Sequence, residues 1–134
     1  MSREGPHVLF CAFAEVPGPS AAGVRTAQMM GAFGSGFDVD GLCLKGPEVA
    51  HIERLGSARV MRVPVESKPF LERLAAYRRA LGRQLSGDHY DVVWCADLFS
   101  GAVAASYKEA HGFSLVVDVD GIPSESFARL TALR

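Results

Sequence analysis

The chain has 134 residues, of which 49% are apolar and 22% charged, and its formal net charge is -1. This length fits one domain with a single hydrophobic core, and the composition is that of a globular protein rather than a disordered or fibrous one. The near-neutral charge excludes a global electrostatic footprint for nucleic acid, so we expect no nucleic-acid partner.

The first predicted elements are a buried strand, a helix and a second strand. His7–Phe13 is a continuous apolar run, which is typical of a strand buried on both faces. Pro17–Ser20 interrupts regular structure, and a helix is predicted to begin near Ala21 and to end before Gly34. Phe37–Leu44 is predicted to form the second strand.

The middle of the chain predicts a short helix followed by a third strand. We expect the helix over Pro47–Leu55, with Gly56 ending it. Ala58–Val65 alternates and is rich in β-branched residues, which predicts a strand. Because that strand contains Pro64, which cannot donate a ladder hydrogen bond, we expect it at an edge of the sheet.

The last predicted elements are two helices and two strands in alternation. Phe70–Leu85 carries an apolar stripe at helical spacing and is the clearest helix in the sequence. Tyr90–Cys95 predicts a fourth strand, Ser100–Ala110 an alanine-rich helix, and Phe113–Val119 a fifth strand.

This alternation of strands and helices predicts an α/β fold. Strands joined by helices give βαβ units and a parallel sheet with helices on both faces. We therefore expect residues 1–134 to form a single Rossmann-like domain, a three-layer α/β/α sandwich. Its sheet should have about five strands in the order 3-2-1-4-5, with a ligand crevice between strands 1 and 4.

The cysteine pattern favours a reducing compartment. Cys11, Cys43 and Cys95 lie far apart in apolar runs, and no C-x-x-C pair occurs, which indicates reduced core thiols. The histidines are scattered, so we expect no metal site. No secretory pattern and no run near the ~20 apolar residues of a membrane span occur, and we expect a cytoplasmic protein.

Three predicted loops follow the carboxyl ends of strands, where ligands of such sheets bind. In the first loop, Gly18 and Gly23 match the ends of G-x-G-x-x-G, but Ser20 replaces the second glycine, and no acid ends the second strand. We therefore expect no nicotinamide or other cofactor. The backbone around Gly23 either binds an anion or hydroxyl-bearing ligand or forms a plain turn.

The other two loops each contain a candidate carboxylate. Asp97 follows the fourth strand, where it either binds hydroxyl groups or caps the next helix. Asp120 follows the fifth strand and is a candidate ligand residue at the same edge.

A cluster of basic residues lies on the predicted helix over Phe70–Leu85. The cluster consists of Arg73, Arg78, Arg79 and Arg83, and Arg73, Arg79 and Arg83 fall mostly off the apolar stripe of this helix. They indicate either a solvated helix face or a peripheral contact with anionic lipid headgroups.

The order of these landmarks resembles that of a known enzyme family over residues 7 to 123. The landmarks follow one another along the chain in this order: a strand, a Pro/Gly loop, Ala22–Arg25, a helix, Gly36–Val39, Arg62–Pro64, an amphipathic helix and Tyr90–Val93. This order is similar to the N-terminal, acceptor-side domain of family 4 glycosyltransferases, which have the two-domain GT-B fold.

The resemblance implies a function and names residues for it. In the family the first loop approaches the donor phosphates and the acceptor, and the matching positions here are Gly23 and Arg25, with Ala22 in place of a glycine. The histidines that commonly follow the fourth strand have no counterpart in Trp94–Asp97. The family's E-x7-E pair belongs to its second domain and does not occur here.

The chain would then be half of an enzyme that moves a sugar from a nucleotide-sugar donor to a sugar or lipid acceptor. It would be inactive without the missing C-terminal donor domain, its partner in the full-length protein. The alternative is a small stand-alone flavodoxin-like binding or regulatory module without catalysis. A phosphate-receiver form of that module is not favoured, since Glu15 is the only acid directly after the first strand.

Overall fold

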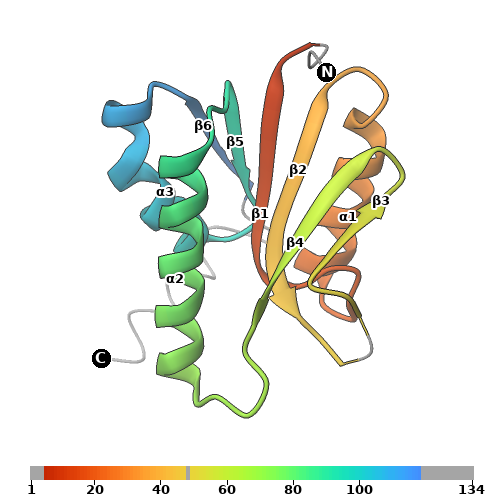
Figure 1. Cartoon of the computed structure of the whole chain (residues 1–134), viewed down its shortest axis with the longest axis vertical. Helices are drawn as coiled ribbons and strands as arrows, with labels where there is room; N and C mark the ends of the chain where they lie inside the picture. Colours follow the sequence, from red (N-terminus) through yellow and green to blue (C-terminus); the bar gives the residue numbers. More distant parts are fainter. Residues whose placement is uncertain (1–4, 48, 119–134) are drawn as a thin grey trace.

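The computed structural model describes residues 5–47 and 49–118. Within these ranges six strands and three helices follow one another along the chain (Figure 1). The elements are β1 (His7–Glu15), α1 (Ala21–Phe33), β2 (Asp38–Lys45), β3 (Ile52–Leu55), β4 (Ala58–Pro64), α2 (Phe70–Gly87), β5 (Val92–Cys95), α3 (Leu98–His111) and β6 (Ser114–Val117).

The strands form one sheet in the order β3-β4-β2-β1-β5-β6. All neighbouring pairs run parallel except β3 and β4, which are antiparallel. Without β3, the order is the predicted 3-2-1-4-5. The winding therefore reverses at β1, and the switch point lies between β1 and β5, as expected for a doubly wound sheet.

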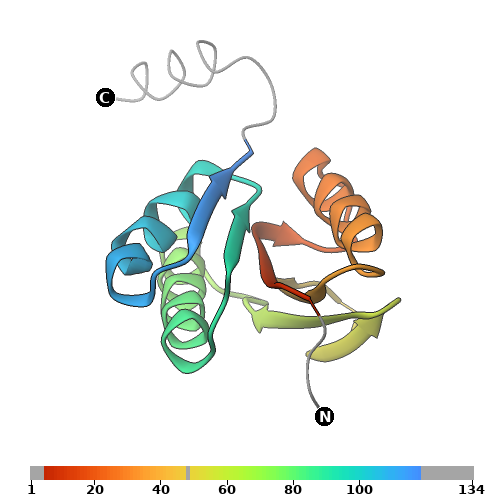
Figure 2. The same cartoon turned by 90° about the horizontal axis from the view of Figure 1, so that it is seen from above.

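Helices cover both faces of the sheet, as predicted (Figure 2). Alternate residues of β1 point to opposite faces, so Leu9 and Cys11 belong to one buried cluster and Val8 and Phe10 to the other. Residues of α2 and α3 complete the first cluster, and α1 covers the second with Met30. The chain is thus a Rossmann-like three-layer α/β/α sandwich.

The predicted helix over Pro47–Leu55 is wrong. Ile52–Leu55 is the antiparallel strand β3, and Leu55 pairs with Ala58 across the two-residue turn of Gly56 and Ser57. Gly56 has a φ of 63°, which a residue without Cβ adopts freely, so this glycine makes a hairpin turn rather than ending a helix.

The hairpin also corrects the predicted edge position of β4. β3 takes the edge of the sheet, and β4 lies between β3 and β2. Pro64 is the last residue of β4, where a missing donor costs least.

β1 is irregular where it reaches the carboxyl edge. Cys11 pairs with Leu42 of β2, but the next pair along the register is Glu15 with Leu44, so β1 has two additional residues in between. Such an irregularity bends a strand and releases backbone groups from the ladder. The released backbone at Phe13 is used by the candidate site.

Candidate functional site

Two polar centres lie at opposite edges of the sheet. The first is at the carboxyl edge, at the lower end of Figure 1, where the chain leaves β1, β2, β4 and β5. The second is at the amino edge, around the first residue of β1. Ligands of doubly wound sheets bind at the carboxyl edge, so the candidate site is built there.

Asp97 connects β1 to α3 at the switch point. One carboxylate oxygen accepts from the backbone N–H of Ser100 at 2.7 Å and so caps the N-terminus of α3. The other oxygen accepts from the N–H of Phe13 at 2.7 Å, the group released by the irregularity of β1. The capping interpretation of Asp97 is therefore confirmed, and a role in hydroxyl binding stays a prediction.

Gly23 allows α1 to begin directly against the end of β1. A Cβ at Gly23 would lie 2.3 Å from the backbone oxygen of Glu15, so a side chain cannot be placed there without moving the helix. Ser20 caps α1: its Oγ accepts from the N–H of Gly23 at 3.0 Å, and its carbonyl accepts from Val24. These backbone donors are thus occupied within the turn.

Arg25 forms an ion pair that crosses from α1 to the end of β6. Its Nε donates to Oδ2 of Asp118, which directly follows β6. The backbone N–H of Asp118 in turn donates to the carbonyl of Cys95 at 2.8 Å, which holds the loop beside β5. The side chain of Arg25 is 49% exposed, so its guanidinium is also open to a ligand.

Asp120 lies outside the described residues, and its predicted role stays a prediction. Asp118, two positions earlier, is described but was not among the candidate residues chosen from the sequence. Nothing in the sequence pairs Asp118 with Arg25, because the two are separated by 93 positions and meet only through the fold.

A hollow of about 320 Å³ opens at the carboxyl ends of β1, β2 and β4, and we call it the rim hollow. Its charged lining consists of Glu15, Lys45, Glu66, Lys68 and Arg73. No local pattern in the sequence groups these residues, since they come from the ends of two strands, from one loop and from one helix.

A buried arginine shapes the loops beside the rim hollow. The side chain of Arg62 has no exposed surface, and it forms an ion pair of 2.6 Å with Glu53 of β3. Its Nε and Nη2 donate to the carbonyl of Val16, and its Nη1 donates to the carbonyl of Ala50. One side chain thus fixes the loops that follow β1 and β2.

The basic residues of α2 do not act as one cluster. Arg73 is half-buried and lines the rim hollow, whereas Arg78, Arg79 and Arg83 are exposed. None of the described helices is long and apolar enough to cross a membrane.

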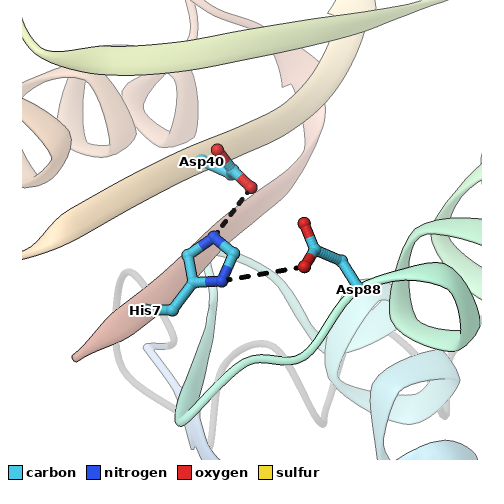
Figure 3. Close-up of side chains that lie close together, drawn as sticks. All are labelled: His7, Asp40 and Asp88. Atoms are coloured by element: carbon cyan, nitrogen blue, oxygen red, sulfur yellow. Dashed lines mark hydrogen bonds and ion pairs between the residues drawn. The ribbon is translucent and has the colours of Figure 1, made fainter. Parts of the chain in front are cut away.

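The second polar centre lies around His7 at the amino edge (Figure 3). Nε2 of His7 is 2.9 Å from Oδ2 of Asp40, and Nδ1 is 2.6 Å from the carbonyl of His89 and 4.0 Å from Asp88. The same oxygen of Asp40 accepts from Tyr90, at 2.7 Å. His7 and Asp40 are both buried, so the network ties β1 to β2 inside the protein.

The electrostatics of this centre favour an ionised Asp40. Burial alone would raise the pKa of Asp40, but hydrogen bonds from Tyr90, His7 and Arg59 outweigh it and hold the pKa below its ordinary 3.8. Burial raises the pKa of Tyr90, which therefore keeps its proton and donates.

His7, Asp40 and Asp88 each offer a ligand atom, and these atoms lie within 4.8 Å of one another. Arg59, however, already donates to Asp40 at 3.1 Å and lies 3.8 Å from Asp88. A cation would have to displace this guanidinium, so we assign the centre to an internal ion-pair network.

The fold has relatives among solved structures. The chain superimposes on a sucrose-phosphate synthase from Thermosynechococcus elongatus with a TM-score of 0.71 and 13% identity, over 92% of this chain and 35% of the synthase chain. It also matches the C-terminal domain of a hydrogenase from Pyrococcus furiosus, with a TM-score of 0.60 and 18% identity, over 88% of this chain and 93% of that one. No family model and no curated protein matches the sequence.

At these identities the likeness shows the fold alone. The chain spans about a third of the synthase chain, and what the two proteins have in common is the fold of that part. The Rossmann-like fold class is thereby confirmed, with one more strand than predicted.

Proposed function

We propose that this chain is the acceptor-side half of a glycosyltransferase, which moves a sugar from a nucleotide-sugar donor to an acceptor. The observation that carries the proposal is the convergence at the switch point. Arg25 of α1, Asp118 after β6 and Asp97 before α3 lie at the carboxyl edge, where doubly wound sheets bind ligands. The structural likeness to part of a sucrose-phosphate synthase supports the choice of reaction.

Each site residue has a role in this proposal. Arg25, half exposed on α1, donates hydrogen bonds to phosphate or hydroxyl oxygens of the bound substrates. Gly23 keeps α1 close to the end of β1, so that Arg25 stands over the switch point. Asp97 holds the same edge together and accepts from an acceptor hydroxyl. Asp120 is a further candidate for this role by its position in the sequence alone.

Sugar transfer needs the donor and the acceptor in one enclosed place, because positioning and the exclusion of water supply much of the rate. This half offers an open edge for the acceptor. A C-terminal domain facing that edge would supply the donor site, and the chain is inactive without it. We place the enzyme in the cytoplasm, where its buried free cysteines stay reduced.

The test compares the chain alone with the full-length protein. We expect the chain to bind sugar nucleotides negligibly in calorimetry and to transfer no sugar. The full-length protein should hydrolyse a nucleotide-sugar or transfer the sugar from it to an acceptor. Micromolar binding of a sugar nucleotide by this chain alone would overturn the half-enzyme proposal.

If the acceptor is a lipid, α2 is the element that we propose meets the membrane. Phe70 and Leu71 at its start are 57% and 75% exposed, and the exposed Arg78 and Arg79 follow on the same helix. Exposed apolar residues beside basic ones favour binding to an anionic lipid surface. Sedimentation with anionic vesicles, compared with neutral ones, tests this contact.

A second candidate function is a stand-alone binding or regulatory module. The observation in its favour is that the hydrogenase domain, which has the same fold, is covered over 93% of its length. A fold of this size therefore occurs as a domain of its own, there at the C-terminus of a longer protein. A natural reading frame that ends near Arg134 would favour the module. A reading frame near three times this length would favour the transferase, because the chain covers 35% of the synthase chain.

A further inference from the structure

One face of the sheet has no helix over β3 and the outer side of β4. α2 lies beside β4, and α1 lies on the opposite face of the sheet (Figure 1). Ile52 of β3 pairs directly with Met61 of β4, and Met61 packs against the cluster that α2 completes, so both side chains lie on the α2 face. Ile52 is 66% exposed. Within the described residues, this part of the α2 face is therefore open and apolar.

A hollow of about 260 Å³ lies between β4 and α2, and we call it the β4 groove. Its lining is mostly apolar and includes Leu42, Met61, Val63, Pro64 and Ala80. Because Ile52 is the direct partner of Met61, it continues this apolar strip outward from the groove. An apolar groove between a helix and a pair of strands has the shape that accepts the apolar face of another helix.

An arginine stands on each side of the apolar strip. Arg83 of α2 lines the β4 groove, and Arg54 of β3 is two residues after Ile52 and so lies on the same face of the strand. Both arginines are exposed, and among the described residues neither forms an ion pair. Arg59 of β4, in contrast, is already bound by two aspartates. The groove thus has uncompensated positive charge at both borders, which acidic side chains of a partner would complement.

The same charges and the shape argue against two other occupants. A second copy of the chain would bring Arg54 and Arg83 towards the same arginines, and like charges across an interface repel each other. An anionic membrane has the complementary charge, but its surface is flat and would not fill a groove that is recessed between β4 and α2. A protein segment with an apolar stripe and acidic borders meets both requirements.

We propose that the β4 groove binds an acidic amphipathic helix of another protein. The apolar stripe of that helix lies on Met61 and Ile52, and aspartate or glutamate side chains on its two borders pair with Arg54 and Arg83. Side chains at i, i+3, i+4 and i+7 form one face of a helix, so acids that flank this face can reach both arginines. The inference is independent of the proposed function, because Arg25 and Asp97 of the carboxyl edge do not line this groove.

The experiment measures the binding of two model peptides to the full-length protein by fluorescence anisotropy. Both peptides have about 18 residues and the same leucine stripe at helical spacing, with glutamate and alanine at the other positions of one and lysine and alanine in the other. We expect the glutamate peptide to bind at least about tenfold more tightly at low salt, and the difference to shrink at high salt. In methyl NMR its binding should shift the resonances of Ile52 and Met61.

Ile52→Glu and Arg83→Glu should each weaken binding of the glutamate peptide about tenfold or more. Both residues are exposed, so both variants should fold like the natural protein, which thermal unfolding checks. Val24→Glu is the control for the first change, since Val24 is 47% exposed and belongs to α1. Arg78→Glu is the control for the second, since Arg78 is exposed on the same helix as Arg83 and does not line the groove. Both controls should bind the peptide like the natural protein.

Several outcomes would overturn the proposal. Equal binding of the two peptides, or equal weakening by Arg78→Glu and Arg83→Glu, would show unspecific attraction, and no binding of the glutamate peptide would remove the helix. A dimer of the natural protein in sedimentation that Ile52→Glu dissociates would assign the face to a second copy instead. Binding to phosphatidylserine vesicles that Ile52→Glu abolishes, without binding of the peptide, would assign it to a membrane.

Discussion

Arg62 donates two hydrogen bonds to the carbonyl of Val16, at 3.1 Å from Nε and 2.8 Å from Nη2. The guanidinium is fully buried and its charge is balanced by Glu53. A side chain from β4 thus fixes the loop between β1 and α1, although β2 lies between β4 and β1 in the sheet.

Arg62→Met should therefore destabilise the protein strongly. The change leaves the carbonyls of Val16 and Ala50 without their charged donors, and each such hydrogen bond is worth about 1–3 kcal/mol, whereas Glu53 is 36% exposed and is solvated by water. Urea unfolding measures the loss. Arg79→Met, at an exposed position, is the control and should change the free energy of unfolding by less than about 0.5 kcal/mol. A similar small change for Arg62→Met would contradict the assigned role.

Arg25→Ala should reduce sugar transfer by the full-length protein without unfolding the domain. Its ion pair with Asp118 is exposed on the arginine side, and exposed pairs contribute at most about 1 kcal/mol to stability. Loss of a charged contact to substrate should lower kcat/KM about tenfold or more. Steady-state kinetics and thermal unfolding together check both halves of this expectation. Unchanged kinetics would remove Arg25 from the site.

Much of the fold follows from local patterns. Apolar runs in the sequence predicted the strands β1, β2 and β5. The apolar stripe of Phe70–Leu85 predicted a helix, and α2 spans Phe70–Gly87 in the structure. The hairpin was missed because its pairing is not local. The turn signal was present, since Gly56 and Ser57 separate two short runs, but we interpreted the glycine as the end of a helix.

The site was less predictable, because its contacts join distant positions. Position in the chain was enough to select Asp97, since the end of β5 is at the switch point. Its bond to Phe13 could not be predicted, since it depends on two additional residues in β1. The grouping of Lys45 with Arg73 likewise appears only when β2 and α2 meet at the edge.

Asp40 should make stability depend on pH in the acid range. Its pKa in the folded protein lies below the ordinary value, so its contribution is fully present above about pH 4 and is lost as pH falls through the folded-state pKa. Urea unfolding at a series of pH values should therefore show that Asp40→Asn is less stable than the natural protein near neutrality. The difference between the two should shrink in acid.

The control for this series is Glu109→Gln, which removes an exposed acid of α3. It should follow the natural protein at every pH. A difference between Asp40→Asn and the natural protein that stays constant into strong acid would show that the ionised carboxylate is not what stabilises the network.

The three cysteines should be unreactive in the folded protein. A hydrogen bond with Cys95, together with burial, raises the pKa of Cys11 well above its ordinary value, and burial raises the pKa of Cys43 to about 11. The thiolate is the reactive form, so alkylation or a disulfide reagent at mildly alkaline pH should label the native protein slowly. All three thiols should react once urea unfolds it. Fast labelling of one thiol in the native protein would place that cysteine at the surface.

Two glycines of α1 allow a matched test of the helix position. A Cβ at Gly31 meets no atom within 4 Å, so Gly31→Ala should gain about 0.5–1 kcal/mol through helix propensity. A Cβ at Gly23 would instead lie 2.3 Å from the backbone oxygen of Glu15, which cannot move without β1. Gly23→Ala should lose about 1–3 kcal/mol and should also lower transfer, because Arg25 shifts with the helix. Chemical unfolding of both variants, with kinetics on the full-length protein, measures this. Equal stability of the two would mean that α1 is not held against the end of β1.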